Sequence, residues 1–396
     1  MGDAEKIRNV ARRIADVRKS GTSVVAVVSA MGDTTDELIE LAHSVSKQPH
    51  PRELDLLLST GELVSCTLLT MALADLGQEA VGLTGSQAGI HTDTTYGRAR
   101  IDRVDTSRMQ KEMEEGRIVV VAGFQGITED EDITTLGRGG SDTTAVALAV
   151  ALEADRCEIY TDVDGIYTAD PKIVPEARKL DEIGYDEMLE LAYYGFKRHP
   201  RSIELGRLYN VPIYVASSFN QTPGTLIHGK ADKKIMENRI KVTGIACTTN
   251  VAKITVRSVP DRPGVAAALF EPLAQSGISV DTIVQNTSQD RTTDISFTVS
   301  GTDLKAALAK VEELTKEIGA GGLASEANLA AVSVVGSGMQ NTPGYASRMF
   351  RMLADGNVNI DMITTSEIRI SCIIKEDQAE EAVRLLHRGF QLDEPE

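Results

Sequence analysis

Ile118-Val-Val-Val-Ala-Gly123 is an unbroken apolar run, and it is followed by Gly137-Arg-Gly-Gly-Ser-Asp142 and an alanine-rich segment over residues 141–153. A strand that is apolar on both faces is typical of a parallel sheet with helices on both sides. The alanine-rich segment indicates a helix, with Ser141 or Asp142 placed to cap it. We therefore predict an α/β domain, a mostly parallel sheet sandwiched by helices, whose ligands lie beyond the carboxyl ends of the strands. Its other strands are expected at residues 23–29, 80–84 and 157–161, and its first helices at residues 7–17 and 51–76.

Composition and charge argue against several classes of protein. The chain has 396 residues, 42% hydrophobic and 25% charged, as expected for a globular protein of about two or three domains. Its net charge of −17 and its 4% aromatic content disfavour binding to nucleic acids or acidic membranes. The four cysteines have no metal-ligand spacing, the start lacks the apolar core of a signal peptide, and the longest apolar runs, residues 24–28 and 145–152, are too short to span a membrane. We expect a cytoplasmic protein with buried, reduced thiols.

The C-terminal part of the chain contains a repeat. Pro263-Gly264 and Asp281 in the first copy match Pro343-Gly344 and Asp361 in the second. Each copy predicts the order strand, helix, strand, strand, helix, which is most of a ferredoxin-like module. Two such modules need a shared interface to cover their sheets. The predicted boundaries are 1–230 for the first domain, 231–250 for a charged linker, 251–320 for the first module and 321–396 for the second.

Three features of the first domain are candidates for chemistry, and each also has an ordinary structural explanation. Arg138 lies between glycines at a predicted helix start, where a guanidinium could bind a carboxylate or phosphate. Glycine turns are also common where a loop simply leads into a helix. Glu62 interrupts an apolar helix and is either solvated or able to hold an ammonium group. Thr161-Asp-Val-Asp-Gly-Ile-Tyr-Thr-Ala-Asp-Pro-Lys172 is either an Asp-rich turn or a nucleotide segment, and it lacks the spacing of a calcium-binding loop. The six histidines show no metal-ligand pattern, and no Ser-His-Asp triad can be singled out.

Taken together, the motifs resemble those of the aspartate kinase family. The tail Asn359-Ile-Asp-Met-Ile-Thr-Thr-Ser-Glu-Ile-Arg-Ile-Ser371 resembles the regulatory ACT domains of that family. The resemblance implies an amino-acid kinase fold followed by two ferredoxin-like βαββαβ ACT domains. It also implies ATP-dependent phosphorylation of the side-chain carboxylate of L-aspartate to 4-phospho-L-aspartate, the first step towards lysine, threonine and methionine, with ATP and Mg²⁺ as cofactors. The front motifs are Ser29-Ala-Met-Gly-Asp-Thr-Thr35, Gly85-Ser-Gln-Ala-Gly89, Gly123-Phe-Gln-Gly126, Leu136-Gly-Arg-Gly-Gly-Ser-Asp-Thr-Thr144 and Thr161-Asp-Val-Asp-Gly165.

The resemblance assigns roles to individual residues of the kinase domain. Arg138 resembles the residue that grips the substrate α-carboxylate, and Glu62 and Asp142 resemble those around its amino group. No residue is assigned to a metal, because Mg²⁺ is expected to arrive mainly on the phosphates. The remaining substrate-side positions are Thr35, Gly139, Gly140 and Ser141. The nucleotide-side positions are Ser29, Thr161, Asp162, Tyr167, Thr168, Ala169, Asp170, Pro171, Lys172 and Lys197.

In the ACT domains, the resemblance implies feedback regulation by lysine and/or threonine. Each effector position can equally be an ordinary turn or strand-end residue. Two ferredoxin-like units with exposed edges favour a homodimer or higher oligomer built through the ACT domains, possibly joined by a separate tail subunit. The negative net charge predicts no nucleic-acid or membrane partner. The effector positions are Asp261, Arg262, Pro263, Gly264, Gln285 and Ser288 in the first copy, and Thr365 and Ser366 in the second.

Two departures from the family pattern affect these expectations. The family opens with a strand ending in Lys-Phe/Tyr-Gly-Gly-Thr/Ser-Ser, whereas this sequence starts at Met1-Gly-Asp-Ala-Glu5, so we expect the chain as written to be weakly active or inactive. Gly195-Phe-Lys-Arg-His-Pro200 is one residue shorter than the family pattern around Lys197. Two alternatives stay open: another amino-acid kinase, such as acetylglutamate or uridylate kinase, and a catalytically silent amino-acid sensor.

Overall fold

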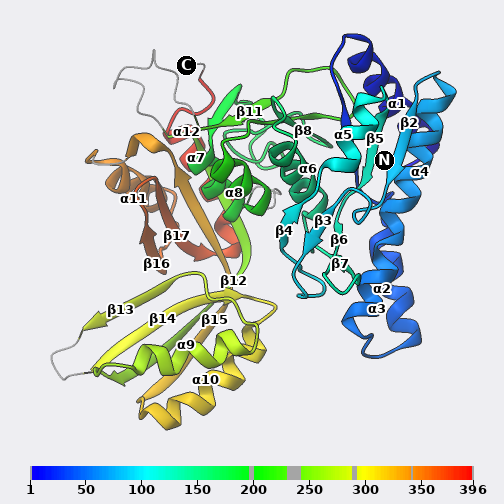
Figure 1. Ribbon diagram of the computed structural model, residues 1–396. Coiled ribbons are helices and arrows are strands. Elements are labelled where there is room, and N and C mark those ends of the chain that lie inside the picture. Colours follow the sequence, from blue (N-terminus) through cyan, green and yellow to red (C-terminus); the bar gives the residue numbers. More distant parts are fainter. Residues whose placement is uncertain (1, 196–199, 230–241, 288–291, 340–341, 395–396) are drawn as a thin grey trace. The chain divides into compact units, whose positions relative to one another are not determined.

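The computed structural model describes residues 2–195, 200–229, 242–287, 292–339 and 342–394 (Figure 1). The chain divides into two compact units. Unit 1 comprises Met1–Ile166, Leu180–Leu189 and Arg198–Ala231. Unit 2 comprises Tyr167–Lys179, Glu190–Lys197 and Asp232–Glu396.

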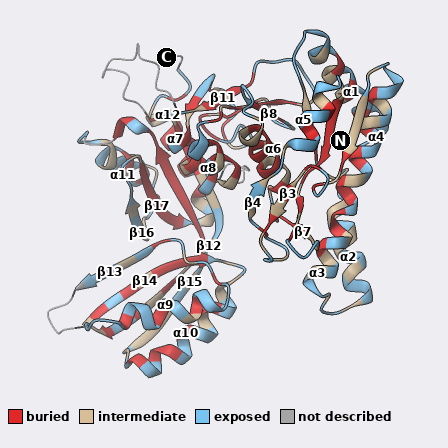
Figure 2. Cartoon of the chain, in the orientation of Figure 1, coloured by how far each residue is buried: buried red, intermediate tan, exposed pale blue. Residues whose placement is uncertain are grey.

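The central strand of unit 1 is β5 (Ile118–Ala122), which is fully buried and pairs in parallel with β1 (Val25–Val28) and β2 (Ala80–Leu83) (Figure 2). Alternate residues of β5 face two different cores. Val120 packs with α1 (Ala4–Lys19) and α4 (Thr60–Asp75), whereas Val121 packs with α5 (Ser107–Glu114) and α6 (Gly140–Ala151). The predicted parallel sheet with helices on both faces is therefore confirmed.

Two further sheets complete unit 1, and both contain antiparallel pairs. One has the order β8-β10-β11-β9, in which β8 and β10 are parallel and β10 and β11 are antiparallel. The other has the order β4-β3-β6-β7. Helix α6 packs against both β1 and β8. The bounds are β8 Cys157–Thr161, β9 Glu182–Gly184, β10 Ile213–Ser217, β11 Thr225–His228, β3 Ile90–Thr92, β4 Ile101–Val104, β6 Gln125–Ile127 and β7 Ile133–Thr135, with helices α2 Thr34–Val45, α3 Pro51–Leu58, α7 Tyr185–Tyr193 and α8 Pro200–Tyr209.

The predicted long helix over residues 51–76 is two helices, α3 and α4, with Ser59 between them. Among the described residues, Pro51–Asp75 is long and apolar enough to cross a membrane by length and composition, a pattern that the sequence analysis did not single out. Nearly half of its apolar window, 44%, is buried inside the fold. It also carries the buried carboxyl groups of Asp55 and Glu62, which are costly to place in lipid. We therefore interpret it as part of the core of unit 1.

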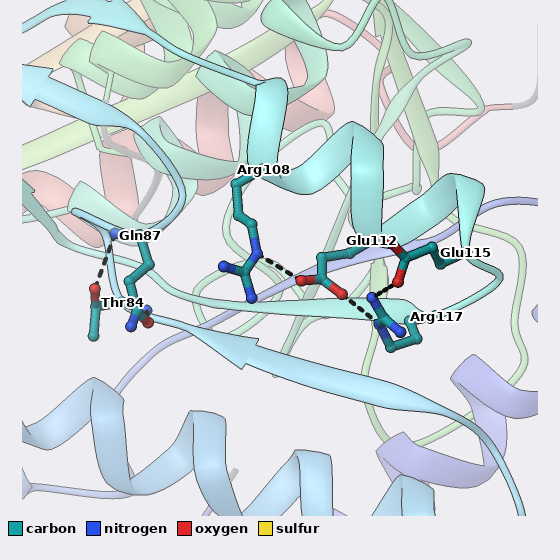
Figure 3. Close-up of polar contacts among 6 residues, drawn as sticks. All are labelled: Thr84, Gln87, Arg108, Glu112, Glu115 and Arg117. Carbon is teal, nitrogen blue, oxygen red and sulfur yellow. Dashed lines mark hydrogen bonds and ion pairs between the residues drawn. The ribbon is translucent and has the colours of Figure 1, made fainter.

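A buried carboxylate ties α5 to the start of β5 (Figure 3). Glu112 is 3% exposed and accepts hydrogen bonds from Arg108 Nε, at 2.5 Å, and from Arg117 Nε. Arg117 also pairs with Glu115. Burial alone would raise the pKa of Glu112, but the hydrogen bonds and charges of Arg117 and Arg108 outweigh it and hold that pKa below its ordinary value.

Glu112→Gln is expected to lower the free energy of unfolding at neutral pH, because an amide cannot replace a carboxylate between two guanidinium groups. A carboxyl group with a lowered folded-state pKa contributes stability above its unfolded pKa, and this contribution is lost as pH falls through the folded value. Urea unfolding should therefore show a gap in the free energy of unfolding between wild type and variant at about pH 7, and this gap should narrow as pH falls from about 4.5, the ordinary pKa, towards about pH 3. Glu115→Gln is the control, because Glu115 pairs with Arg117 and not with Arg108. A gap that is equal at both pH values would contradict the assignment.

Unit 2 contains one six-stranded antiparallel sheet with the order β13-β14-β12-β15-β17-β16. Each predicted module contributes three strands and two helices, and the long central strands β12 and β15 pair with each other along both modules. Strand β12 begins at Gly244, so the end of the predicted linker 231–250 lies in the sheet. The bounds are β12 Gly244–Pro260, α9 Val265–Gln275, β13 Ile283–Thr287, β14 Thr292–Ser300, α10 Leu304–Ile318, β15 Gly322–Val335, η2 Ser337–Met339, α11 Tyr345–Asp355, β16 Met362–Thr365, β17 Arg369–Lys375, η3 Glu376–Gln378 and α12 Ala379–Gly389.

The shared strands change register at their midpoints. Asn250 in β12 has φ 59° and Asn328 in β15 has φ 55°, both left-handed, and the β12–β15 register shifts beside them. Asparagine tolerates this conformation better than most residues. One half of each strand then pairs within the first module and the other half within the second. The interface that the two modules were expected to share is therefore this pairing of β12 with β15.

The cysteines are free thiols. Cys66, Cys157 and Cys372 are buried, as predicted, whereas Cys247 is only partly buried. Burial raises the pKa of Cys157 and of Cys372 to about 12, which keeps both sulfurs in the unreactive thiol form.

Candidate functional site

The first part of the candidate site is the segment that follows β1, which lies against the start of α4. The two approach so closely that a Cβ on Gly61 would lie 3.0 Å from the Ala30 Cβ. The Ala30 N–H donates to Glu62 Oε1 at 3.0 Å, and Glu62 is only 3% exposed. Its other oxygen, Oε2, is buried and has no hydrogen-bond partner among the described residues. Glu62 therefore faces the end of β1, and one of its two carboxylate oxygens is without a hydrogen-bond donor among the described residues.

The electrostatics of Glu62 follow from this burial. Removal from water raises the pKa of Glu62 to about 7, and the Ala30 N–H only partly opposes the shift. A buried carboxylate without a cation is unfavourable. A ligand ammonium group at Oε2 would supply both the missing charge and the missing donor.

The second part of the site is the beginning of α6, which glycines shape. Gly139, at φ 69°, is the N-cap, and the helix begins at Gly140, so the predicted cap at Ser141 or Asp142 is wrong by two or three positions. A left-handed glycine, which has no side chain to strain, caps the helix in their place. Gly140 must also lack a side chain, because a Cβ there would lie 2.7 Å from Phe124 Cδ2. Thr144 Oγ1 accepts from the Phe124 N–H at 3.2 Å and so ties the helix to the end of β5.

The side chains at this helix start differ in their burial and in their neighbours. A Cβ on Gly123 would lie 3.0 Å from Ser141 Oγ and 2.9 Å from a Val27 methyl carbon, so Ser141 sits at the ends of β1 and β5. Arg138 is exposed and has no hydrogen-bond or ion-pair partner within the described part of the chain. Asp142 is partly buried, and its charge raises the pKa of the nearby Cys157 thiol further than burial alone does. Thr35 lies in the first turn of α2, partly buried.

The predicted nucleotide positions fall in both units. In unit 1, Ser29 is exposed at the end of β1, and Thr161 at the end of β8 donates from Oγ1 to Asp162 Oδ1 at 3.0 Å. In unit 2, Asp170, Pro171 and Lys172 are exposed and Tyr167 is partly buried. Lys197 lies outside the described residues.

Thr168 and Ala169 differ from their predicted role. Thr168 is fully buried, and its hydroxyl contacts His387 Nε2 at 2.9 Å and accepts from the Arg178 N–H at 3.0 Å. Ala169 is equally buried and belongs to an apolar core of unit 2. Their side chains are therefore structural, and of the predicted segment only the tip, residues 170–172, is exposed.

The predicted effector positions of the first ACT copy line a pocket of about 360 Å³ where β12 leads into α9. Gly264, at φ 92°, is the N-cap of α9, so the helix presents its amide end there. Ser288 lies outside the described residues. In the second copy, Thr365 is exposed at the end of β16, whereas Ser366 Oγ donates to Glu190 Oε1 at 3.0 Å. The pocket brings together Asp261, Arg262, Pro263, Gly264 and Gln285.

Comparison with known proteins finds family matches for both the N-terminal and the C-terminal parts of the chain. Residues 1–217 match the amino acid kinase family, and residues 254–316 and 332–390 each match the ACT domain. An aspartokinase of Mycolicibacterium smegmatis is 49% identical over 99% of this chain and 94% of its own length. An aspartokinase of Pseudomonas aeruginosa is 49% identical over 100% and 96%. The chain belongs to the aspartokinase family.

Two solved structures place family ligands on related folds. E. coli aspartokinase III in complex with aspartate and ADP is 29% identical, with a TM-score of 0.74 over 90% of this chain and 80% of that one. The same enzyme in complex with lysine and aspartate is 26% identical, with a TM-score of 0.71 over 96% of both chains. These likenesses confirm the predicted fold class, an amino-acid kinase domain followed by ACT domains.

Two buried residues that support the site were missed by the sequence analysis. Gln125 donates from Nε2 to the Ser59 carbonyl at 2.9 Å, just before α4, and a Cβ on Gly85 would lie 2.4 Å from the Gln125 carbonyl oxygen. The glycine motifs at residues 85–89 and 123–126 therefore contact each other. Asp55 accepts from the Gly97 and Thr135 N–H groups, each at 2.8 Å. An acidic residue in the apolar stretch before Glu62 was the available signal.

Proposed function

We propose that the chain transfers the γ-phosphoryl group of ATP to the side-chain carboxylate of L-aspartate, giving 4-phospho-L-aspartate and ADP. The observation that carries the proposal is the pair of unsatisfied charges at the end of the parallel sheet. Glu62 has one buried oxygen without a donor, and Arg138 is an unpaired guanidinium. Opposite charges of this kind suit the ammonium and α-carboxylate groups that an amino acid carries. Membership of the aspartokinase family supports aspartate as that amino acid.

The proposed reaction needs positioning more than acid–base chemistry. The substrate side chain, with an unperturbed pKa near 3.9, is already an anionic nucleophile at neutral pH. The barrier is the approach of this carboxylate to a polyphosphate, which fixed charges and orientation reduce. Arg138 and Glu62 would fix the amino-acid backbone, Ser141 would orient it, and the exposed Lys172 would meet phosphate charge.

Magnesium is proposed to bind with the nucleotide. The described residues contain no group of three or more His, Cys, Asp and Glu side chains that could hold a metal. Mg²⁺ prefers oxygen ligands and usually takes phosphate oxygens with at most one or two carboxylates, so it would arrive mainly on the nucleotide. When bound, the ion would neutralise phosphate charge.

The function is tested by measuring ADP release with a panel of acceptors, and by trapping the acyl phosphate with hydroxylamine. We expect slow but measurable ADP release and hydroxamate formation with L-aspartate, and none with N-acetylglutamate or UMP. Turnover of one of those acceptors in place of aspartate would favour another amino-acid kinase. Binding of lysine or threonine without turnover of any acceptor would favour a silent sensor.

We further propose that lysine and/or threonine bind in the pocket at α9. The amide end of that helix suits an effector carboxylate, and Gln285 and Asp261 offer acceptors for an ammonium group.

The edge strands β13 and β16 of the sheet each pair on one side only within the described residues, which favours a homodimer or higher oligomer through this unit. Four free thiols suit the cytoplasm.

Gln285→Ala is expected to raise the effector concentration for half-maximal inhibition by about tenfold, because a buried ligand group would lose its hydrogen-bond partner. The rate without effector should stay unchanged. Inhibition curves with lysine and with threonine measure the effect, and Gln275→Ala, at the far end of α9, is the control. Unchanged inhibition in Gln285→Ala would remove the pocket from the effector site.

A further inference from the structure

The segment Tyr167–Lys179 is a loop with a closed base and a defined tip. At the base, Tyr167 and Lys179 form an antiparallel bridge, and the Thr168 N–H donates to the Arg178 carbonyl at 2.8 Å. At the tip, Asp170 Oδ1 accepts from the Lys172 N–H at 2.9 Å. The tip is exposed, whereas Thr168 and Ala169 are fully buried.

Helix α12 of the second ACT domain holds this loop through two polar contacts. His387 Nε2 lies 2.9 Å from Thr168 Oγ1, and His387 is 2% exposed. Arg384 Nε donates to the Ile173 carbonyl at 3.1 Å. His387 and Arg384 are three residues apart and so lie on the same face of the helix. Burial lowers the pKa of His387, so the neutral ring can bond the threonine hydroxyl without a buried charge.

Apolar packing and a strand contact fix the loop to the same domain. Ala169, Val174 and Ala177 belong to one core with Val383 and Leu386 of α12. In addition, the Ile245 N–H of β12 donates to the Thr168 carbonyl at 2.7 Å. The loop is therefore part of the regulatory domain in its packing, although the resemblance assigns it to the nucleotide.

We propose that α12 positions the tip residues 170–172 for the nucleotide, with His387, Thr168 and Arg384 as positioning residues. This inference rests on the proposed function, in which the tip meets ATP. A displacement of α12 shifts the base of the loop and with it the tip, so a change in the second ACT domain alters nucleotide affinity. Because coupling free energies are reciprocal, a nucleotide at the tip stabilises this arrangement of α12 in turn. Aspartate affinity depends on Glu62 and Arg138 in unit 1 and is not part of this coupling.

The test compares the binding constant for MgATP, by calorimetry, and the KM values for ATP and aspartate in the full chain. Thr168→Val removes the hydroxyl at nearly constant volume, and Thr168→Ser keeps it. We expect Thr168→Val and Arg384→Ala each to weaken ATP binding by about tenfold, with the KM for aspartate unchanged and with rescue in Thr168→Ser. Lys172→Ala tests the tip itself and should weaken ATP binding as well.

Matched controls separate positioning from general loosening of the domain. Ser333→Ala removes another buried hydroxyl contact of unit 2, to Ser371, and Glu380→Gln removes an ion pair of Arg384 without touching its bond to Ile173. Both should leave ATP binding unchanged even if the melting temperature falls. The inference is overturned if Lys172→Ala weakens ATP binding while Thr168→Val and Arg384→Ala do not, or if the controls weaken it equally. If Lys172→Ala also has no effect, then residues 170–172 do not contact ATP, and the proposal that α12 positions them for the nucleotide is wrong as well.

Discussion

Arg138→Ala is expected to lower kcat/KM for aspartate by about a hundredfold or more while leaving the melting temperature unchanged. A guanidinium and a carboxylate form paired, charge-assisted hydrogen bonds, about twice as strong as neutral ones. Truncating such a pair costs about 2–5 kcal/mol, and about 1.4 kcal/mol corresponds to a factor of ten. The fold should not respond, because Arg138 is exposed and has no partner in the described part of the chain.

Steady-state kinetics with aspartate varied at saturating ATP measure the loss, and thermal unfolding checks the fold. Arg138→Lys should recover only part of the activity, since an ammonium group cannot make the paired contact. Arg8→Ala, an exposed arginine on α1, is the matched control. Full activity in Arg138→Ala would remove this arginine from the substrate site, and so would a loss that follows a lowered melting temperature.

The sequence predicted best where local chemistry decides the structure. The run ending at Gly123 predicted a strand buried on both faces, because every residue from Ile118 to Ala122 is apolar, and the structure confirms it. The glycines around Arg138 predicted an open helix start. The exact cap was not predicted, because capping by a left-handed glycine competes with capping by Ser141 or Asp142.

The sequence predicted less where contacts between segments far apart in the chain determine the structure. Thr168 and Ala169 lie in a motif that resembles a nucleotide loop, yet Thr168 is bonded to His387, 219 residues further along the chain. No local pattern encodes such a contact. Conversely, the position of Glu62 in an apolar helix left two explanations open, and its burial beside Ala30 excludes the solvated one.

Glu62→Gln is expected to raise the KM for aspartate by about a hundredfold and, unusually for an active-site change, to stabilise the ligand-free protein above neutral pH. Loss of one partner of a buried charge pair costs about 2–5 kcal/mol of binding, which accounts for the first effect. The second follows from the pKa of Glu62, which burial raises from an ordinary 4.5 to about 7. A carboxyl group whose folded pKa is raised binds its proton more tightly in the folded state, so stability falls as pH rises from the unfolded to the folded value.

The ionisation of Glu62 should make both aspartate affinity and the free energy of unfolding depend on pH, and Glu62→Gln should lack this dependence. In the wild type, aspartate should bind more tightly as pH rises through about 7, because only the ionised Glu62 attracts the ligand ammonium group. In Glu62→Gln, the part of both curves that Glu62 contributes should be absent, so the variant and the wild type should diverge as pH rises through about 7. Calorimetric titration with aspartate and urea unfolding, each at several pH values from about 5 to 8, measure the two curves. Parallel curves for wild type and variant would show that Glu62 does not titrate there, and aspartate affinity would then depend on the charge of another group.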